Sequence, residues 1–470
     1  AWVSRNEFIK ALPIIDLVWT GSDDHVQGLR RIVSVTKVPI KAGTYALGFR
    51  QTEGENVWVT PSGVIGKDGF QAEPKIIYIR PPGDTVADKI EFTLHPREET
   101  IELANKVYPE LLRLNEAHII VPILGWFFAT AFKSRLIKIL KHFPLLMVHG
   151  TPGSGKTSLL KNVFWPLFGA KRNVNAFSCR STYHPILIAM GASTDVPLFF
   201  DELKYGDMRR NGRWETYTTM MRRSYDGESE ERGHRDMSVT RYELSAPLAV
   251  AGETAPENDE ALLERMVLVC TSKNTLTPDR QAAYKHLQTL PFEQLAGAYV
   301  QWSLGQDNAI EEHLKKAREL VASKTDVSMP PRIKDNLIVV AFGLLVFDAW
   351  CTELGIEIPS VDLREIFTSL LDEIAGGEKG SAGQVRDSFD AFMEFISLCA
   401  RNKSLQENEH FTHINHKLFL HLESCYQVYL AERRKTDQGD ETNGLRALRR
   451  RAREKMEEGS YVVGVDQQVT

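Results

Sequence analysis

The sequence predicts an α/β protein: a core with a parallel β-sheet, an N-terminal α+β domain before it, and a C-terminal helical region and small domain after it. Three observations support this fold class. Short apolar runs alternate with helix-forming segments between residues 144 and 275, which is typical of a parallel sheet with crossover helices. Before that region the chain reads mainly as short strands divided by Gly, Pro and Asp. From Thr277 onward it reads mainly as helices.

Length and composition indicate a multidomain globular chain. The 470 residues are 43% hydrophobic and 25% charged, which excludes a wholly disordered, collagen-like or coiled-coil protein. The net charge of −5 means that any contact with nucleic acid must depend on local basic patches. The longest apolar stretches, Ile119–Phe132 and Leu337–Phe347, are shorter than the roughly 18 residues of a membrane span. The five cysteines form no CxxC pair, so we expect a reducing, cytoplasmic setting and no membrane partner.

Changes of pattern along the chain predict five segments. They are a β-rich N-terminal domain (1–110), a helical connector (111–143), the α/β core (144–275), a helical lid region (276–395) and a C-terminal domain (396–470).

Individual elements follow from local periodicity. In the N-terminal domain, strands are predicted at Tyr45–Gln51, Asn56–Thr60, Lys75–Arg80 and Ile90–Leu94, and helical periodicity covers Glu98–Lys141. In the core, strands are predicted at Leu145–His149, Val196–Phe200, the end of Arg241–Ala251 and Met266–Cys270, with helices over Thr157–Phe168 and Arg213–Tyr225.

The segment after the first core strand matches the phosphate-binding pattern GxxxxGK[ST] and directly precedes a predicted helix. Glycines let backbone N–H groups curl around a phosphate, and the helix offers its positive N-terminus to the anion. Lys156 would reach the β- and γ-phosphates of ATP, and the Thr157 hydroxyl suits Mg²⁺. The residues placed against the nucleotide are Gly150, Thr151, Pro152, Gly153, Ser154, Gly155, Lys156, Thr157 and Ser158.

Two adjacent carboxylates end the next apolar strand. Asp201 would hold Mg²⁺ through its water shell, and Glu202 would orient the attacking water as general base. An acidic pair alone says little, because strand ends often carry solvated acids. Its place after a phosphate-binding loop is what favours ATP hydrolysis.

Two further polar positions follow. A strand over Pro247–Ala251 ends in Gly252, Glu253 and Thr254, and Arg265 directly precedes the last core strand. These elements, in this order, resemble those of an AAA+ ATPase.

The resemblance implies that Arg265 is an arginine finger for the γ-phosphate held by a neighbouring subunit. It also implies that Glu253 or Thr254 senses the γ-phosphate, although Asn is commoner at that position. The alternatives are a surface Arg–Glu pair at Arg265 and an ordinary polar strand end at Glu253.

Segments around these motifs resemble the helicase module of phage and plasmid primase–helicases. They are Gly125–Thr130, Phe143–Leu146 and Leu248–Glu253, while Trp19–Asp23 resembles the domain that precedes such modules. The likeness covers Trp19–Val269 well and the rest loosely. It implies an ATP-dependent DNA helicase or translocase in phage or mobile-element replication, a ring that we expect to be a hexamer, and a primase as partner.

The same group resembles the minichromosome-maintenance and superfamily-three helicases, in which a β-hairpin projects into a central pore. Ser229–Leu244 fits such a hairpin, with His234 and Arg235 near its tip as DNA contacts. Arg332, in Pro330–Arg332, resembles the leading Arg of a helix that contacts nucleotide phosphate. The alternatives are an ordinary surface hairpin and a plain helix start with proline.

The C-terminal segment reads as helix, turn and helix, over Leu418–Leu430 and Leu445–Lys455. The second helix is basic. Helicases of the resembling group often carry a winged helix here, which would bring Arg449 and Arg450 to DNA. The alternative is a solvated charged helix.

Two other functions stay open from the sequence. One is an AAA+ machine that remodels proteins or loads another ring, although no aromatic–hydrophobic–Gly pore motif stands out. The other is a module that uses ATP binding as an assembly switch. The intact pair Asp201 and Glu202 favours hydrolysis over such a switch.

Overall fold

The computed structural model describes most of the chain. The described residues are 21–35, 41–81, 83–204, 208, 212–233, 239–256, 259–324, 330–359, 361–374, 388–414, 417–435, 445, 448–449, 452–453, 456 and 464.

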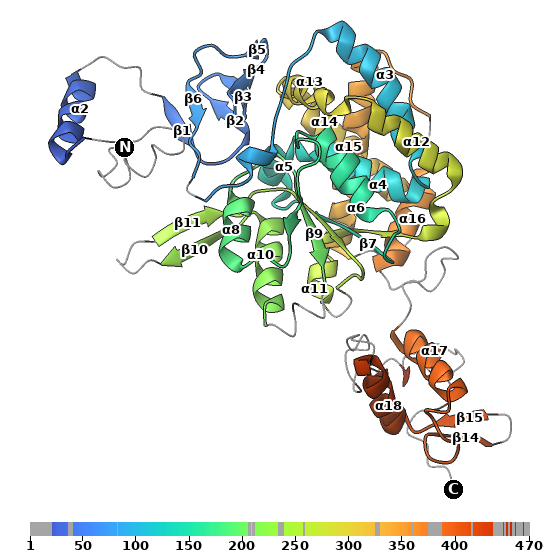
Figure 1. The fold of residues 1–470 in the computed structure, drawn as a ribbon. Coiled ribbons are helices and arrows are strands. Elements are labelled where there is room, and N and C mark those ends of the chain that lie inside the picture. The colour runs from blue at the N-terminus through green and yellow to red at the C-terminus, as the bar shows by residue number, and fades with distance from the viewer. Residues whose placement is uncertain are drawn as a thin grey trace.

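A five-stranded parallel sheet forms the centre of the protein (Figure 1). Its spatial order is β13–β7–β12–β9–β8, and every neighbouring pair is parallel. All six residues of β7 are buried, so both faces of the sheet are covered. This confirms the predicted α/β fold class with a parallel sheet. The strands are β7 (Leu145–Gly150), β8 (Phe177–Ser178), β9 (Leu198–Leu203), β12 (Leu248–Gly252) and β13 (Met266–Thr271).

The helix that follows β7 is continuous from residue 156 to residue 167 but changes its pitch. It consists of α6 (Lys156–Leu159), a π-helical turn η3 (Leu160–Phe164) and α7 (Trp165–Leu167). The wide turn lies just before Pro166, which has no N–H to donate to the preceding turn. The other helices of the core are α8 (Tyr183–Gly191), α10 (Trp214–Asp226) and α11 (Glu260–Leu263).

Two helices cross almost in contact in the helical region. A Cβ on Gly343 of α15 (Pro331–Leu354) would lie 1.7 Å from the Gly125 carbonyl oxygen of α4 (Ala117–Thr130), so the backbones can meet only at glycine. Trp126, the next residue, donates from Nε1 to the Pro144 carbonyl at 2.8 Å and so fastens α4 to the start of β7. The segment Gly125–Thr130 therefore has a packing role.

The other elements of the helical region surround this crossing. By length and composition α15 could cross a membrane, and so could α4 and α5 together if the bent pair formed one span. However, 67% of the most apolar 18-residue stretch of α15 is buried inside the protein. These elements are α3 (Arg97–Arg113), α5 (Lys133–Leu140), η4 (Lys273–Thr275), α12 (Pro278–Thr289), η5 (Phe292–Gln294), α13 (Leu295–Ser303), α14 (Asp307–Lys324) and α16 (Leu363–Ile374).

The N-terminal part contains small sheets, as predicted. Its antiparallel sheet has the order β2–β3–β4–β5, and β1 pairs with β6 in parallel. Its elements are α2 (Asp23–Val35), β1 (Ala42–Thr44), β2 (Gly48–Thr52), β3 (Glu55–Val59), β4 (Val64–Gly66), β5 (Gly69–Phe70), β6 (Ile76–Tyr78) and η2 (Ala87–Lys89).

The predicted strand at Ile90–Leu94 is wrong. Only an isolated bridge joins Ile90 to Ala170. The alternating pattern instead reflects the burial of Ile90 and Phe92 in the main core. Helix α13 covers the backbone here, because a Cβ on Gly297 would lie 1.9 Å from the Thr93 carbonyl oxygen. A helix, and not a neighbouring strand, therefore packs on this extended segment.

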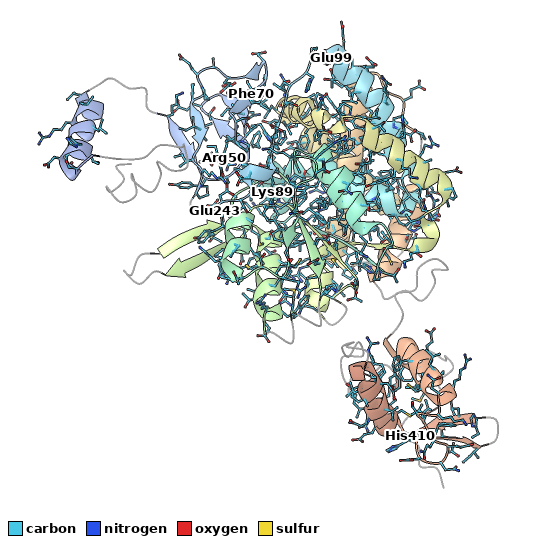
Figure 2. All side chains as sticks on the ribbon, viewed as in Figure 1. Arg50, Phe70, Lys89, Glu99, Glu243 and His410 are labelled. Atoms are coloured by element: carbon cyan, nitrogen blue, oxygen red, sulfur yellow. The ribbon has the colours of Figure 1, made fainter. Side chains whose placement is uncertain are left out.

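A buried carboxylate joins the N-terminal sheet to the core. Asp195, just before β9, is fully buried; its Oδ2 accepts from Phe49 N at 3.1 Å and its Oδ1 from Ser134 N at 2.8 Å. Arg50 donates to Thr194 Oγ1 at 2.7 Å beside this contact, and Figure 2 shows Arg50 at the junction. The N-terminal sheet is thereby tied to α5 and to the segment that leads into β9.

The predicted hairpin is present as β10 (Ser229–Gly233) and β11 (Val239–Glu243), which pair antiparallel. A separate C-terminal core includes Phe392, Cys425, Tyr429 and Leu448. Its elements are α17 (Ser388–Arg401), β14 (Phe411–Ile414), β15 (Lys417–Leu420) and α18 (Leu422–Lys435).

Helices α3 and α17 run through the predicted domain boundaries at residues 110 and 395. The structure does not divide the chain at these two positions. The five-segment division and the winged helix stay predictions.

Candidate nucleotide-binding site

The loop Gly150–Thr157, the predicted phosphate-binding loop, leaves the carboxyl end of β7 and turns directly into α6. Gly150, Gly153 and Gly155 have φ angles of 145°, 79° and 91°, which residues with a Cβ rarely adopt. At Gly150 a Cβ would also lie 2.0 Å from the Thr271 carbonyl oxygen. The glycines of the motif are therefore required both by backbone conformation and by the close approach of β13.

A hydroxyl pair fastens the loop to β13. Ser154 is fully buried, and its Oγ lies 2.8 Å from Thr271 Oγ1, which in turn donates to the His149 carbonyl at 3.0 Å. The Ser154 side chain thus holds the shape of the loop, and its backbone N–H donates to the Thr151 carbonyl at 3.1 Å within the loop.

Lys156 lies in the mouth of the loop. Its Nζ donates to the Gly150 carbonyl at 2.7 Å and to the Thr151 carbonyl at 3.1 Å. Burial lowers the pKa of this ammonium, and the nearby charges of Glu253 and Asp201 offset part of the shift. The lysine and both carboxylates therefore share one electrostatic neighbourhood, as expected of a site for a metal-bound phosphate chain.

The acidic pair lies in a bulge at the end of β9. Phe200 pairs with Val250 but Leu203 pairs with Gly252, so Asp201 and Glu202 together face one residue of β12. Glu202 has φ of 62°, and its N–H donates to Asp201 Oδ1 at 2.8 Å. In a regular strand the two side chains would point to opposite faces, whereas a bulge re-aims one of them.

The bulge has a conformational cost. A left-handed non-glycine residue costs roughly 1–3 kcal/mol and is common at functional sites. Because the strands are parallel and Gly252 pairs with His149, Asp201, Glu202 and the phosphate-binding loop lie at the same carboxyl edge of the sheet.

Glu253 follows β12 at this edge, as the sequence predicted. Its Oε1 lies 3.7 Å from Nζ of Lys204, a residue that was not among the predicted site residues. Lys204 comes two positions after Glu202, and this closeness to the acidic pair is the feature of the sequence that could have indicated it. The pair is about half exposed, so Lys204 can exchange the carboxylate for a phosphate, and Glu253 can exchange the ammonium for solvent.

Arg265 and Arg332 lie at the opposite edge of the sheet. The Arg265 carbonyl accepts from Leu145 N at 3.0 Å, at the start of β7, and the phosphate-binding loop begins after the end of that strand. Five residue steps along a strand span about 17 Å, which is longer than an arginine side chain. Neither guanidinium can therefore meet a phosphate held by its own loop.

The two arginines differ in how firmly they are held. The Arg265 side chain is 12% exposed, donates to the Ala261 carbonyl at 2.6 Å and lies 3.7 Å from Asp226. Arg332 is 50% exposed and lies 3.0 Å from Glu264. Arg332 is therefore the more accessible of the two.

The structure describes only part of the predicted DNA contacts. His234, Arg235 and Arg450 lie outside the described residues. Arg449 is exposed, and its Nη2 lies 3.5 Å from Glu423 Oε2 of α18.

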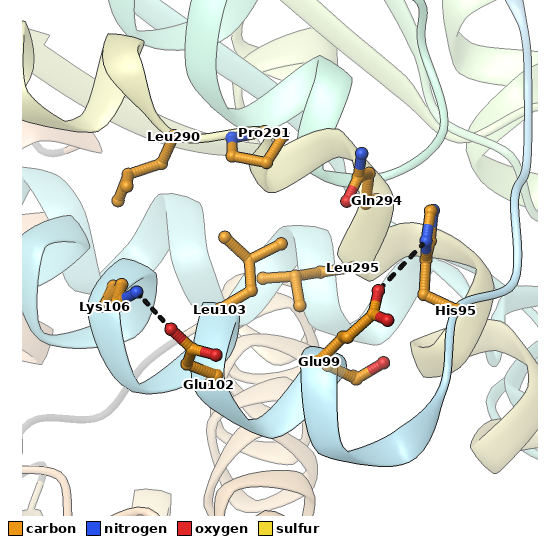
Figure 3. Close-up of a pocket in the computed structure, with 10 residues that line it drawn as sticks. His95, Glu99, Glu102, Leu103, Lys106, Leu290, Pro291, Gln294 and Leu295 are labelled. Atoms are coloured by element: carbon orange, nitrogen blue, oxygen red, sulfur yellow. Dashed lines mark hydrogen bonds and ion pairs between the residues drawn. The ribbon is translucent and has the colours of Figure 1, made fainter.

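A surface pocket of about 220 Å³ lies between α3 and the α12–α13 region (Figure 3). Its charged side chains are already paired, with Lys106 2.6 Å from Glu102 and His95 3.9 Å from Glu99. None of the residues that line it belongs to the phosphate-binding loop or to β9. We assign it no ligand.

No protein-family model matches the sequence, and no curated protein matches it. Among solved structures, the active helicase Cch of SCCmec type IV is similar, with a TM-score of 0.52 and 12% identity over 91% of this chain and 79% of that chain. The A form apo structure of the NrS-1 C-terminal region covers 76% of this chain and 83% of its own, at 15% identity and a TM-score of 0.24. By the first of these similarities, the chain shares its fold with a helicase.

Proposed function

We propose that this chain is an ATP-dependent DNA helicase or translocase of a phage or mobile-element replication system, which hydrolyses ATP between the subunits of a ring. One observation carries the proposal: the loop with Lys156 and the bulged pair Asp201 and Glu202 lie together at the carboxyl edge of the sheet. The helicase fold of the chain supports the same function.

The site fits a Mg²⁺–nucleotide complex. Among the described residues, the Lys156 ammonium has partners closer than 3.2 Å only in two carbonyls of its own loop, and phosphate oxygens can replace these bonds. Thr157 and Asp201 supply a hydroxyl and a carboxylate, the hard oxygen ligands that Mg²⁺ prefers. When bound, Mg²⁺ would neutralise the charge of the phosphate chain. Mg²⁺ would be held by Thr157 and Asp201.

The protein side of the reaction then divides among named groups. Backbone N–H groups of the loop and Lys156 bind and orient the phosphates. Glu202, the second carboxylate of the bulge, would position a water and take its proton at the carboxylate. Glu253 would sense the γ-phosphate, and Lys204, whose Nζ lies 3.7 Å from Glu253 Oε1, would offset the negative charge of the glutamate beside that phosphate.

A neighbouring subunit completes the site in this proposal. Arg265 and Arg332 lie about a strand length from their own loop, so they can stabilise transferred phosphate only across a subunit interface. Such head-to-tail contacts close into rings, and a hexamer is the expected size.

DNA contacts are assigned to the hairpin β10–β11 and to the C-terminal unit. His234 and Arg235 would lie at the hairpin tip, and Arg449 and Arg450 in the C-terminal unit. The exposed pair of Arg449 with Glu423 is worth at most about 1 kcal/mol, so a DNA phosphate can replace it. A primase is the expected functional partner, and the cytoplasm the expected location.

ATPase activity measured with and without single-stranded DNA, beside particle mass in Mg–ATP, tests this function. We expect DNA to stimulate hydrolysis and ATP to favour a ring, and a strand-displacement assay then separates helicase from translocase. Glu202→Gln should bind ATP without turnover. Hydrolysis stimulated by a protein substrate but not by DNA would favour a remodeller or loader, and binding without hydrolysis would favour an assembly switch.

A further inference from the structure

The segment that follows β13 lies along the outside of the phosphate-binding loop. The Cβ positions of the three left-handed glycines of the loop each meet this segment in turn: Gly150 meets Thr271 at 2.0 Å, Gly153 meets Lys273 Cε at 3.1 Å, and Gly155 meets Leu276 Cδ2 at 3.4 Å. The loop and residues 271–276 are therefore packed together over their whole length.

Lys273 brings a positive charge to this contact. Its Nζ lies 3.7 Å from the Cβ position of Gly153, and the side chain is exposed. Within the part of the chain that the structure describes, the Lys273 side chain forms neither a hydrogen bond nor an ion pair, and only its backbone carbonyl has a partner, the N–H of Leu276. An ammonium that rests on a phosphate-binding loop without a carboxylate partner is available to an anionic ligand of that loop.

The order of strands says which end of the nucleotide lies near Lys273. Asp201, Glu202 and Glu253 follow β9 and β12 on one side of β7, whereas Lys273 follows β13 on the other side. Neighbouring strands are about 4.8 Å apart, so β13 and β9 are separated by roughly 14 Å. A phosphate chain laid across the loop therefore has its γ-phosphate toward β9 and its α-phosphate toward β13.

We infer that Lys273 is a further nucleotide-binding residue, which contacts the α-phosphate at the nucleoside end of the site. The inference rests on the proposed nucleotide-binding function. Because the α-phosphate is common to nucleoside di- and triphosphates, Lys273 contributes equally to the binding of ATP and ADP. Lys204 and Glu253, on the γ side, contribute to ATP alone.

Calorimetric titration of the full chain with Mg–ATP and Mg–ADP tests the inference. Lys273→Ala should weaken both nucleotides by the same factor, roughly tenfold or more, as for loss of a charged hydrogen bond. Lys273→Arg should retain most of the affinity, and Lys285→Ala, an exposed lysine on α12, should change neither. A thermal melt without nucleotide checks that Lys273→Ala is folded.

The outcomes separate the two proposals. Unchanged binding by Lys273→Ala, beside a wild type that binds both nucleotides, overturns the role of Lys273 and leaves the proposed function standing. A loss confined to ATP overturns the α-phosphate assignment. Failure of the wild type to bind either nucleotide overturns the proposed function itself.

Discussion

The position of Arg265 leads to a test of hydrolysis between subunits. The Arg265 backbone lies about 17 Å from the phosphate-binding loop of its own chain, so Arg265→Ala should leave nucleotide binding intact and reduce turnover. An arginine finger is worth roughly a thousandfold or more in rate, or about 4 kcal/mol of barrier. Its partner Asp226 is 39% exposed, so solvent can replace the arginine at that carboxylate and the lost pair should cost only about 1 kcal/mol of stability. The rise in the activation barrier should therefore far exceed the fall in the free energy of unfolding.

Mixing two inactive variants gives the decisive measurement. Lys156→Ala lacks a working loop but keeps its arginine, and Arg265→Ala keeps its loop. In randomly assembled rings of equal amounts, roughly a quarter of the interfaces join an intact loop to an intact arginine. We expect ATPase activity to return to about that fraction of wild type, and Arg332→Ala in place of Arg265→Ala identifies which arginine is the finger. If neither mixture regains activity while all three variants form rings, the trans arrangement is refuted.

Three further changes probe the packing that supports the site. Asp195→Ala leaves the Phe49 and Ser134 N–H groups unpaired and should lower the free energy of unfolding by about 3–5 kcal/mol in urea titration, with Asp195→Asn costing less; equal stability of all three proteins would contradict the role given to this carboxylate. Gly343→Ala should lower the thermal midpoint sharply, because its methyl would overlap the Gly125 carbonyl, whereas Gly305→Ala, whose methyl would meet only the Trp302 carbonyl at 3.6 Å, should change it by much less; similar shifts for the two would argue against the tight helix crossing. Burial lowers the pKa of Lys133 to about 7, so between pH 7 and 10 the unfolded chain binds one more proton than the folded chain and stability gains a rising contribution with pH. Urea titrations at pH 7 and pH 9 should show a smaller rise in Lys133→Met than in wild type, and an identical rise would refute the shift.

Much of the site was predictable because its motifs are local. A run of glycines with Lys156 and Thr157, placed between an apolar strand and a helix, has few conformations that satisfy it, and the structure has that strand and that helix. The hairpin β10–β11 was predictable for the same reason, since its two arms are neighbours along the chain.

Contacts between distant segments were not predictable in this way. The sequence shows that Asp201 and Glu202 end a strand, but the bulge that turns them depends on the pairing of β9 with β12. Ile90–Leu94 alternates like a strand, but the prediction of a strand there is wrong. A strand needs a neighbouring strand to pair with, and this segment packs against helix α13.

Residue types and short spacings along the chain thus predict a phosphate-binding loop and an acidic pair, and they predict the α/β core that the structure has, since each pattern depends on interactions within a few residues. Tertiary structure alone decides that Asp195 joins the N-terminal sheet to α5, that Lys273 rests on Gly153, and that Arg265 lies a strand length from its own loop. Those three relations join residues that lie far apart in the sequence, and their proximity is a property of the folded chain as a whole.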